Sequence, residues 1–249
     1  VPVANRLYIH RGIRDGVPTC EDVTEQVGLK PLPMKAPHVE LQDFDNDGWV
    51  DLFCNIVKFA DGKAYPLVFK NQGLKGGLPQ FTENALSVND FPNESDQAIK
   101  RSGTFFEKMI AEGKVIYSAP GPVADFDRDG RLDWFLANWW AESPSMLLKN
   151  ETPSGHWLDV RVKGTGGVNA QGIGSRVNVY APGKLGDPNA LLASRDIAVG
   201  FGYASGQEAA AHIGLGDLKS CDVEVILPHG KGKIERVGVE ADQRITLEK

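Results

Sequence analysis

The sequence predicts an all-β protein in two parts, residues 1–152 and residues 153–249. Three observations predict this class. Short runs of β-branched and aromatic residues alternate with turns that contain glycine, proline or asparagine. Two acidic loops of the same pattern are each followed by a strand-like run. From about residue 156 onward, apolar and polar residues alternate, which is typical of half-buried strands.

The first part contains a recurring pair of short strands. The runs at 6–12 and 67–73 each lead through a glycine-containing turn to a second run, at 20–24 and 81–84. A third start of the same kind occurs at 146–150. The sequence therefore predicts a repeating order of strand, turn, strand, linker, strand, acidic loop and strand.

Two nine-residue loops carry the strongest functional signal. Residues 43–51 and 125–133 both read D-x-D-x-D-G-x-x-D, with aspartate at positions 1, 3, 5 and 9 and glycine at position 6. Alternate carboxylates on a turning backbone converge on one centre, and Ca²⁺ binds about six to eight oxygens at about 2.3–2.6 Å. Four carboxylates repel one another unless a cation neutralises them. We therefore expect one Ca²⁺ in each loop.

The expected ligands are the four aspartates of each loop and the main-chain carbonyl at position 7. They are Asp43, Asp45, Asp47, Trp49 and Asp51 in the first loop, and Asp125, Asp127, Asp129, Arg131 and Asp133 in the second. An EF-hand is not favoured, because its loop needs a glutamate at position 12 and a helix on either side. Cys54 and Leu136 stand at that position, and strand-like runs follow both loops.

These loops and strand pairs resemble the FG-GAP/VCBS repeat of β-propeller blades over about residues 5–150. In that family the acidic loop joins the first two strands of a blade, which implies a calcium-ligand role for the matching aspartates. If the acidic loops occupy this place in each blade, the resemblance implies that residues 6–24 are the last two strands of a blade that begins before Val1. Propellers close with about four to eight blades, so the resemblance implies either further blades upstream or a reduced variant.

The two loops are separated by more residues than one blade needs, and the excess lies at 87–117. A capping-box pattern opens this insertion, and Phe106, Met109 and Ile110 fall on one helical face. The sequence therefore predicts a short helix at about 104–112. The insertion either plugs the core of this protein or contacts a partner, and the edge of the incomplete first blade is a second expected contact.

The second part has five or six expected strands, which predict a β-sandwich or barrel. They include runs at 156–162, 172–180, 195–199, 222–228 and 244–247. Together with Trp157-Leu158, the motifs Gly172-Ile173-Gly174-Ser175-Arg176-Val177 and His212-Ile213-Gly214-Leu215-Gly216 resemble the ASPIC/UnbV domain. Its combination with FG-GAP/VCBS repeats is that of cartilage acidic proteins and of bacterial and algal secreted proteins. This resemblance implies an extracytoplasmic protein without a defined reaction.

Other classes find little support in the sequence. No G-x-S-x-G elbow, H-E-x-x-H helix or Walker lysine is present, and no basic stripe suggests nucleic acid. No apolar run approaches the length of a membrane span. The net charge of −6 reflects the acidic loops, because residues 157–249 are charge-balanced. His212 is either a metal ligand or base, or a hydrogen-bonded structural histidine.

Several smaller features of the sequence lead to further expectations. The three cysteines, Cys20, Cys54 and Cys221, predict free thiols, with a Cys20–Cys54 bridge as the alternative. A start at Val1 predicts a processed or truncated N-terminus. The sequons at Asn93 and Asn150 are glycosylated only if the source is a secreting eukaryote. The pair Trp139-Trp140 is either part of the core or a platform for carbohydrate.

We therefore expect a non-enzymatic, calcium-stabilised interaction or scaffolding protein that is secreted, periplasmic or in an organelle lumen. The first alternative is an accessory subunit of a larger, even membrane-bound, complex in such a compartment. The second is a metal-assisted hydrolase, which needs an open coordination position and a nearby base. Four carboxylates in each loop leave little room for that position.

Overall fold

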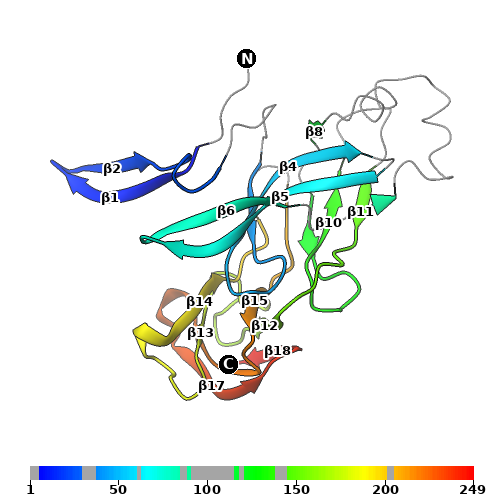
Figure 1. Cartoon of the computed structure of the whole chain (residues 1–249). Coiled ribbons are helices and arrows are strands. Elements are labelled where there is room, and N and C mark those ends of the chain that lie inside the picture. Colours follow the sequence, from blue (N-terminus) through cyan, green and yellow to red (C-terminus); the bar gives the residue numbers. More distant parts are fainter. Residues whose placement is uncertain are drawn as a thin grey trace. The chain divides into compact units, whose positions relative to one another are not determined.

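The structure is a computed structural model that describes residues 6–29, 38–60, 63–84, 89–90, 115–117, 121–137, 145–200 and 205–249. Regular structure in these residues is β, apart from two single-turn 3-10 helices at Pro188–Ala190 and Pro228–Gly230 (Figure 1). The predicted all-β class is thus confirmed for this part of the chain. The helix expected at 104–112 lies outside the described residues, as does most of the insertion. Within the described residues, no helix is long and apolar enough to span a membrane.

In the described part of the chain, eleven strands precede residue 150. They are β1 (Tyr8–Arg14), β2 (Val17–Asp22), β3 (Glu40–Gln42), β4 (Asp51–Ala60), β5 (Lys63–Lys75), β6 (Leu78–Asn84), β7 (Asn89–Asp90), β8 (Val115–Tyr117), β9 (Val123–Ala124), β10 (Asp133–Leu136) and β11 (Met146–Leu148). β1 and β2 form a hairpin. A second sheet has the order β3-β4-β5-β6, with β7 paired to β5 and β8 to β4, and a third has the order β11-β10-β9. The strand that was expected after each acidic loop is present as β4 or β10.

Seven strands follow among the residues that the structure describes after position 150. They are β12 (His156–Lys163), β13 (Arg176–Tyr180), β14 (Leu191–Asp196), β15 (Ala211–Gly216), β16 (Ser220–Ile226), β17 (Lys233–Glu240) and β18 (Gln243–Glu248). One sheet has the order β15-β12-β18, in which β12 and β18 run parallel. The other has the order β14-β13-β16-β17.

The C-terminal strands differ from the expected ones in four places. β15 and β17 were not expected, because β15 reads as a glycine motif and β17 is rich in charge. The run expected at 172–180 is a strand only from Arg176 onward, since Gly172 and Gly174 have positive φ and form turns. The strand expected at 195–199 instead ends at Asp196.

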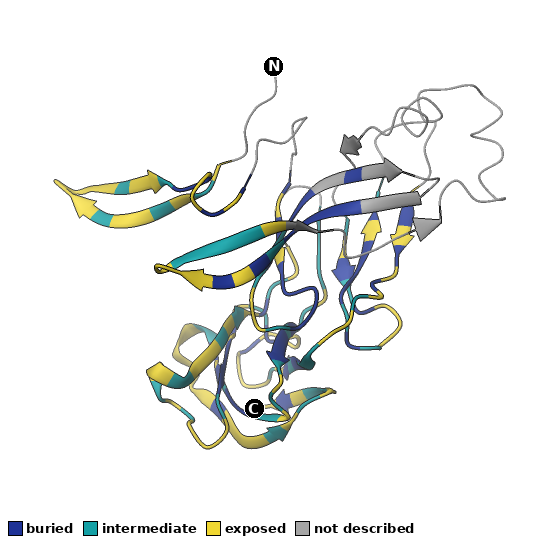
Figure 2. Ribbon diagram, in the orientation of Figure 1, coloured by how far each residue is buried: buried dark blue, intermediate teal, exposed yellow. Residues whose placement is uncertain are grey.

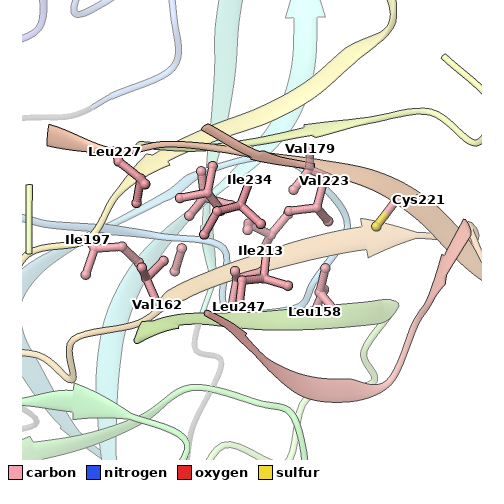
Figure 3. Close-up of a cluster of buried hydrophobic side chains, with 14 of the residues drawn as sticks. Leu158, Val162, Val179, Ile197, Ile213, Cys221, Val223, Leu227, Ile234 and Leu247 are labelled. Atoms are coloured by element: carbon pink, nitrogen blue, oxygen red, sulfur yellow. The ribbon is translucent and has the colours of Figure 1, made fainter. Parts of the chain in front are cut away.

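A single cluster of buried side chains draws on both C-terminal sheets (Figure 3). Alternate residues of β12 enter it, namely Leu158, Val160 and Val162, together with valines of β13 and β16. Burying one such side chain stabilises a fold by about 1.5–3 kcal/mol. The expected alternation is therefore confirmed. It leaves the intervening residues of β12 on the opposite face of their sheet.

Figure 2 shows buried residues along β12 and β15, whereas β1 and β2 are mostly exposed. A smaller cluster in the N-terminal part includes Val27, Cys54 and Phe69. The three cysteines are free thiols, so the alternative Cys20–Cys54 bridge is not formed.

The chain divides into two compact units. One comprises residues 1–42, 50–120 and 136–146, and the other comprises residues 43–49, 121–135 and 147–249. Most of both acidic loops therefore belongs to the same unit as the C-terminal sheets.

Candidate metal centre

The two acidic loops have the same backbone conformation. At position 4, Asn46 and Arg128 have φ of 55° and 66°, and at position 6, Gly48 and Gly130 have φ of 91° and 87°. A non-glycine residue adopts positive φ only uncommonly, so its recurrence at the same position is informative. The two sequences, which share only their aspartates, glycine and a phenylalanine, fold into one shape.

The aspartate at position 1 closes each loop. Oδ1 of Asp43 accepts a hydrogen bond from the amide of Asp47 at 3.1 Å, and Oδ2 accepts one from the amide of Gly48 at 2.9 Å. Asp125 accepts the equivalent bonds from positions 5 and 6 at 3.0 and 3.1 Å. These bonds hold the turn while the carboxylate still faces the centre of the loop.

The aspartate at position 9 is anchored by an asparagine from the next strand or strand end. Asp51 accepts from the amide of Asn71 at 2.8 Å, and the Asn71 side chain donates to the carbonyl of position 8 at 3.0 Å. In the second loop, Asp133 accepts from the amide of Asn150 at 2.7 Å, and the Asn150 side chain donates to the carbonyl of position 8 at 3.2 Å. Neither asparagine was expected to belong to the site. The signal that could have found them is the Lys-Asn pair that recurs at 70–71 and 149–150.

The aspartates at positions 1, 3 and 9 come together in both loops. Carboxylate oxygens of one triad all lie within 4.8 Å of one another, and the triads are Asp43, Asp45 and Asp51, and Asp125, Asp127 and Asp133. Two oxygens bound to the same ion at about 2.3–2.6 Å lie at most about 5 Å apart. The spacing therefore fits one hard cation per loop, and each triad could hold a metal ion.

The residues expected at positions 5 and 7 are arranged differently. Asp47 and Asp129 are not members of the triads. Instead, each accepts a hydrogen bond from the amide of position 7, Trp49 at 2.8 Å and Arg131 at 3.0 Å. A role of these two carboxylates and of the position-7 carbonyls as ligands remains a prediction.

Burial and charge differ between the two triads. Asp43, Asp45 and Asp51 are all buried, and burial raises the pKa of Asp43 to about 7. In the second loop Asp127 is exposed and pairs with Lys149, which lowers the pKa of Asp127. Burial raises the pKa of Asp125 and of Asp133 in that loop. A raised pKa marks a carboxylate whose charge lacks compensation in the metal-free protein.

The two loops contact each other directly. The side chain of Asn150 donates to the carbonyl of Phe44 at 2.7 Å as well as to the second loop. The rings of Phe44 and Trp134, both fully buried, have centroids 4.1 Å apart. The loops therefore form one structural element with two triads.

Asn46 joins both loops to the C-terminal sheets. Its Nδ2 donates to the carbonyl of Gly130 and to Oγ of Ser154, both at 2.8 Å. Its Oδ1 accepts a bond of 2.8 Å from Nε2 of His212, and its carbonyl accepts one of 2.8 Å from the amide of Gly216. His212 is thus hydrogen-bonded as a structural histidine and is not a member of either triad, and burial lowers its pKa to about 3.

Two glycines allow this close contact. A Cβ at Gly214 would lie 2.0 Å from Oδ2 of Asp43 and 2.6 Å from the Cα of Asn46. A Cβ at Gly130 would lie 1.9 Å from the indole nitrogen of Trp157. The glycine motif at 212–216, which the sequence offered without a role, is the surface on which the first loop packs.

Residues 164–249 match the family model described as ASPIC and UnbV. The C-terminal part of this chain is an ASPIC/UnbV domain. The matched residues include β13–β18 and thus the glycine motif that contacts the first loop.

The chain is also similar to cartilage acidic protein 1 over most of its length. It is 30% identical to the mouse protein (Mus musculus) and 29% identical to the human protein (Homo sapiens), in each case over 229 residues. The Xenopus tropicalis protein is 26% identical over 229 residues. These residues are 91% of this chain and 30% of each relative, so the chain spans about a third of the relatives' length. The resemblance to cartilage acidic proteins is thus confirmed as a distant relationship.

Proposed function

We propose that this chain is a calcium-binding interaction or scaffolding protein. In this proposal, Ca²⁺ bound in two acidic loops stabilises the loops that pack against the ASPIC/UnbV domain. The observation that carries the proposal is the repeated geometry of the loops. They share positive φ at positions 4 and 6, the same bonds to the position-1 and position-9 carboxylates, and triads of matching spacing.

The chemistry of the donors favours calcium over other cations. The triads offer carboxylate oxygens only, whereas zinc and copper sites generally include nitrogen or sulfur ligands. Mg²⁺ demands a near-ideal octahedron and keeps several waters, whereas Ca²⁺ accepts irregular and more numerous ligands. The buried triad of the first loop supports this choice, because three buried carboxylates are costly without a cation.

The hydrogen bonds to the carboxylates support a structural role for the metal. The position-1 and position-9 aspartates each brace backbone amides, so an ion that they hold is tied to the shape of the loops. A hydrolase would need an open coordination position and a base. His212 is engaged with Asn46 instead. We therefore propose a non-enzymatic role.

We also propose an extracytoplasmic location and a protein partner. Calcium is abundant outside the cytosol, and modules there bind it with dissociation constants of about 10⁻⁴–10⁻³ M. Among the described residues, the β1–β2 hairpin supports a partner contact, because Tyr8, Ile13 and Val17 are 54%, 72% and 62% exposed. The insertion at 87–117 stays a predicted contact.

Calcium titration of metal-stripped protein by calorimetry tests the central claim. Wild type should bind two equivalents, and Asp45→Ala and Asp127→Ala should each remove one. Asp217→Ala, an exposed aspartate outside both loops, is the matched control and should keep both. Calcium should also raise the melting temperature, because it binds the folded state only. An absence of calcium binding in the wild type would remove the proposal.

A further inference from the structure

The sheet β15-β12-β18 has a second, polar face. Leu158, Val160 and Val162 enter the core, so Trp157, Asp159 and Arg161 lie on the other side of β12. His212 of β15 and Arg244 of β18 are the register partners of Asp159. Side chains of paired residues share a face. Five polar or aromatic side chains therefore gather on this face.

A cavity of about 320 Å³ opens between this face and the second acidic loop. Trp157, Arg161 and Arg244 line it from the sheet, and Asp125 and Arg128 line it from the loop. One water molecule takes about 30 Å³ of liquid. The space therefore suits a molecule of several heavy atoms rather than a single bridging water.

Three buried polar atoms at this face have no hydrogen-bond partner. They are Nε of Arg161, Oδ1 of Asp159 and Nδ1 of His212. Other bonds of the same side chains are made: Arg244 donates to Asp159 at 3.0 Å and to Glu208 at 3.1 Å, and Arg161 pairs with Glu208. Buried polar groups are nearly always satisfied. Nε of Arg161 needs a hydrogen-bond acceptor, whereas Oδ1 of Asp159 and Nδ1 of His212 need a donor, so a ligand that carries both kinds of group suits this face.

The charge of the cavity depends on the second loop. Arg128, Arg161 and Arg244 stand against the carboxylates of Asp125, Asp159 and Glu208. If Asp125 holds calcium, as proposed above, its charge is shared with the ion. The cavity then carries an excess of positive charge. This step rests on the proposed function, whereas the cavity and its arginines do not.

We propose that this cavity binds a small organic anion of about the size of a sugar. A carboxylate or sulfate group would lie on the three guanidinium groups, because guanidinium binds such oxyanions through two parallel hydrogen bonds. The indole of Trp157 supplies the apolar part of the wall for the body of the ligand.

Binding of glucuronate to the calcium-loaded chain, followed by calorimetry or NMR titration, tests the inference. Glucuronate should bind at least about tenfold more tightly than glucose, because only glucuronate offers charge-assisted bonds. Inorganic sulfate should compete with glucuronate. Competition would show that the anionic group of glucuronate occupies the site formed by the arginines.

Arg128→Asn should weaken glucuronate about tenfold. Asparagine tolerates the positive φ of this position, so the loop should keep its shape, which calcium titration of the variant checks. Arg236→Gln, an exposed arginine outside the cavity, is the charge-matched control and should bind as wild type.

Three results would overturn the inference: no binding of glucuronate, equal binding of glucose, or unchanged binding in Arg128→Asn. Failure of the calcium proposal gives a different pattern. In that case the chain binds no calcium, and glucuronate still binds through the arginines and still depends on Arg128, but it binds more weakly because Asp125 keeps its full negative charge.

Discussion

The two acidic loops have one backbone and one pattern of aspartates, but they lie in different surroundings. In the first loop all three triad carboxylates are buried, and the positive charge that acts on Asp43 belongs to Arg195 of β14. In the second loop Asp127 is exposed and pairs with Lys149, and Asp129 pairs with Arg131. The carboxylates of the second loop therefore have basic partners in Arg131 of the loop itself and in Lys149.

This difference shows that one ligand motif can have two electrostatic settings. A cation in the first loop replaces a missing counter-charge in a buried site, where interactions are weakly screened. A cation in the second loop competes with Lys149 for an exposed carboxylate. We therefore expect the first loop to bind calcium more tightly and to contribute more to the free energy of unfolding.

The largest expected effect comes from the contact that distinguishes the first loop. Gly214→Ala places a Cβ 2.0 Å from the Asp43 carboxylate, and overpacking of this severity should cost about 3 kcal/mol or more. Denaturant unfolding should show the loss, and calcium titration should show weaker binding in the first loop. Gly200→Ala, whose Cβ meets nothing within 4 Å, should remain close to wild type. A Gly214→Ala protein of wild-type stability would contradict the packing.

Removal of the metal should expose a pH dependence that comes mainly from the first loop. The pKa of Asp43 is about 7 in the folded protein and about 4 when unfolded. A carboxyl group whose pKa is raised in the folded state contributes stability that is present below pH 4 and is lost as the pH rises through 7. Metal-stripped wild type should therefore lose on the order of 4 kcal/mol across that window, since one pKa unit corresponds to about 1.4 kcal/mol.

Two variants separate the loops in that measurement. Asp43→Asn should flatten the decline in unfolding free energy between pH 4 and pH 7, whereas Asp125→Asn should flatten it less. Calcium should abolish the decline in wild type, because the ion takes the place of the proton. An equal slope in Asp43→Asn and wild type would show that other groups cause the decline.

The asparagine anchors offer a smaller and graded comparison. The Asn150 side chain donates to both loops and accepts from Thr152, whereas that of Asn71 donates to one carbonyl and accepts from Gly73. At about 1 kcal/mol per bond, Asn150→Ala should cost about 3 kcal/mol at most and Asn71→Ala about 2 kcal/mol at most. Thermal unfolding measures both, and the reverse order would mean that Asn150 does not join the loops.

The smallest expected effect concerns Lys149, the basic residue that pairs with Asp127 of the second loop. Lys149→Gln removes an exposed ion pair, which should change the free energy of unfolding by less than about 1 kcal/mol. Calcium should bind the second loop a few-fold more tightly, because a competing positive charge is gone. Lys163→Gln, which removes an exposed pair with Glu248, should leave calcium affinity unchanged. Weaker calcium binding in Lys149→Gln would contradict the competition.

Local sequence patterns were sufficient for much of the fold and the site. Alternation along β12 predicted which of its residues enter the core, because successive side chains of a strand point to opposite faces. The spacing predicted that the four aspartates of each loop converge, because ligands supplied by one short loop are close in sequence, and the structure brings those at positions 1, 3 and 9 together. The same reasoning missed β15 and β17, whose glycines and charges resemble turns until a neighbouring strand pairs with them.

The sequence by itself determined the class of fold, the two acidic loops and the oxygen-only donors that they offer. Only the tertiary structure decided that His212 holds Asn46, 166 positions away, that Gly214 admits the first loop, and that Asn150 joins both loops. It also decided that Asp43 is buried whereas Asp127 is exposed. The physical reason is that a ligand motif fixes the chemistry of its side chains, whereas burial and pKa depend on the distant residues that cover them.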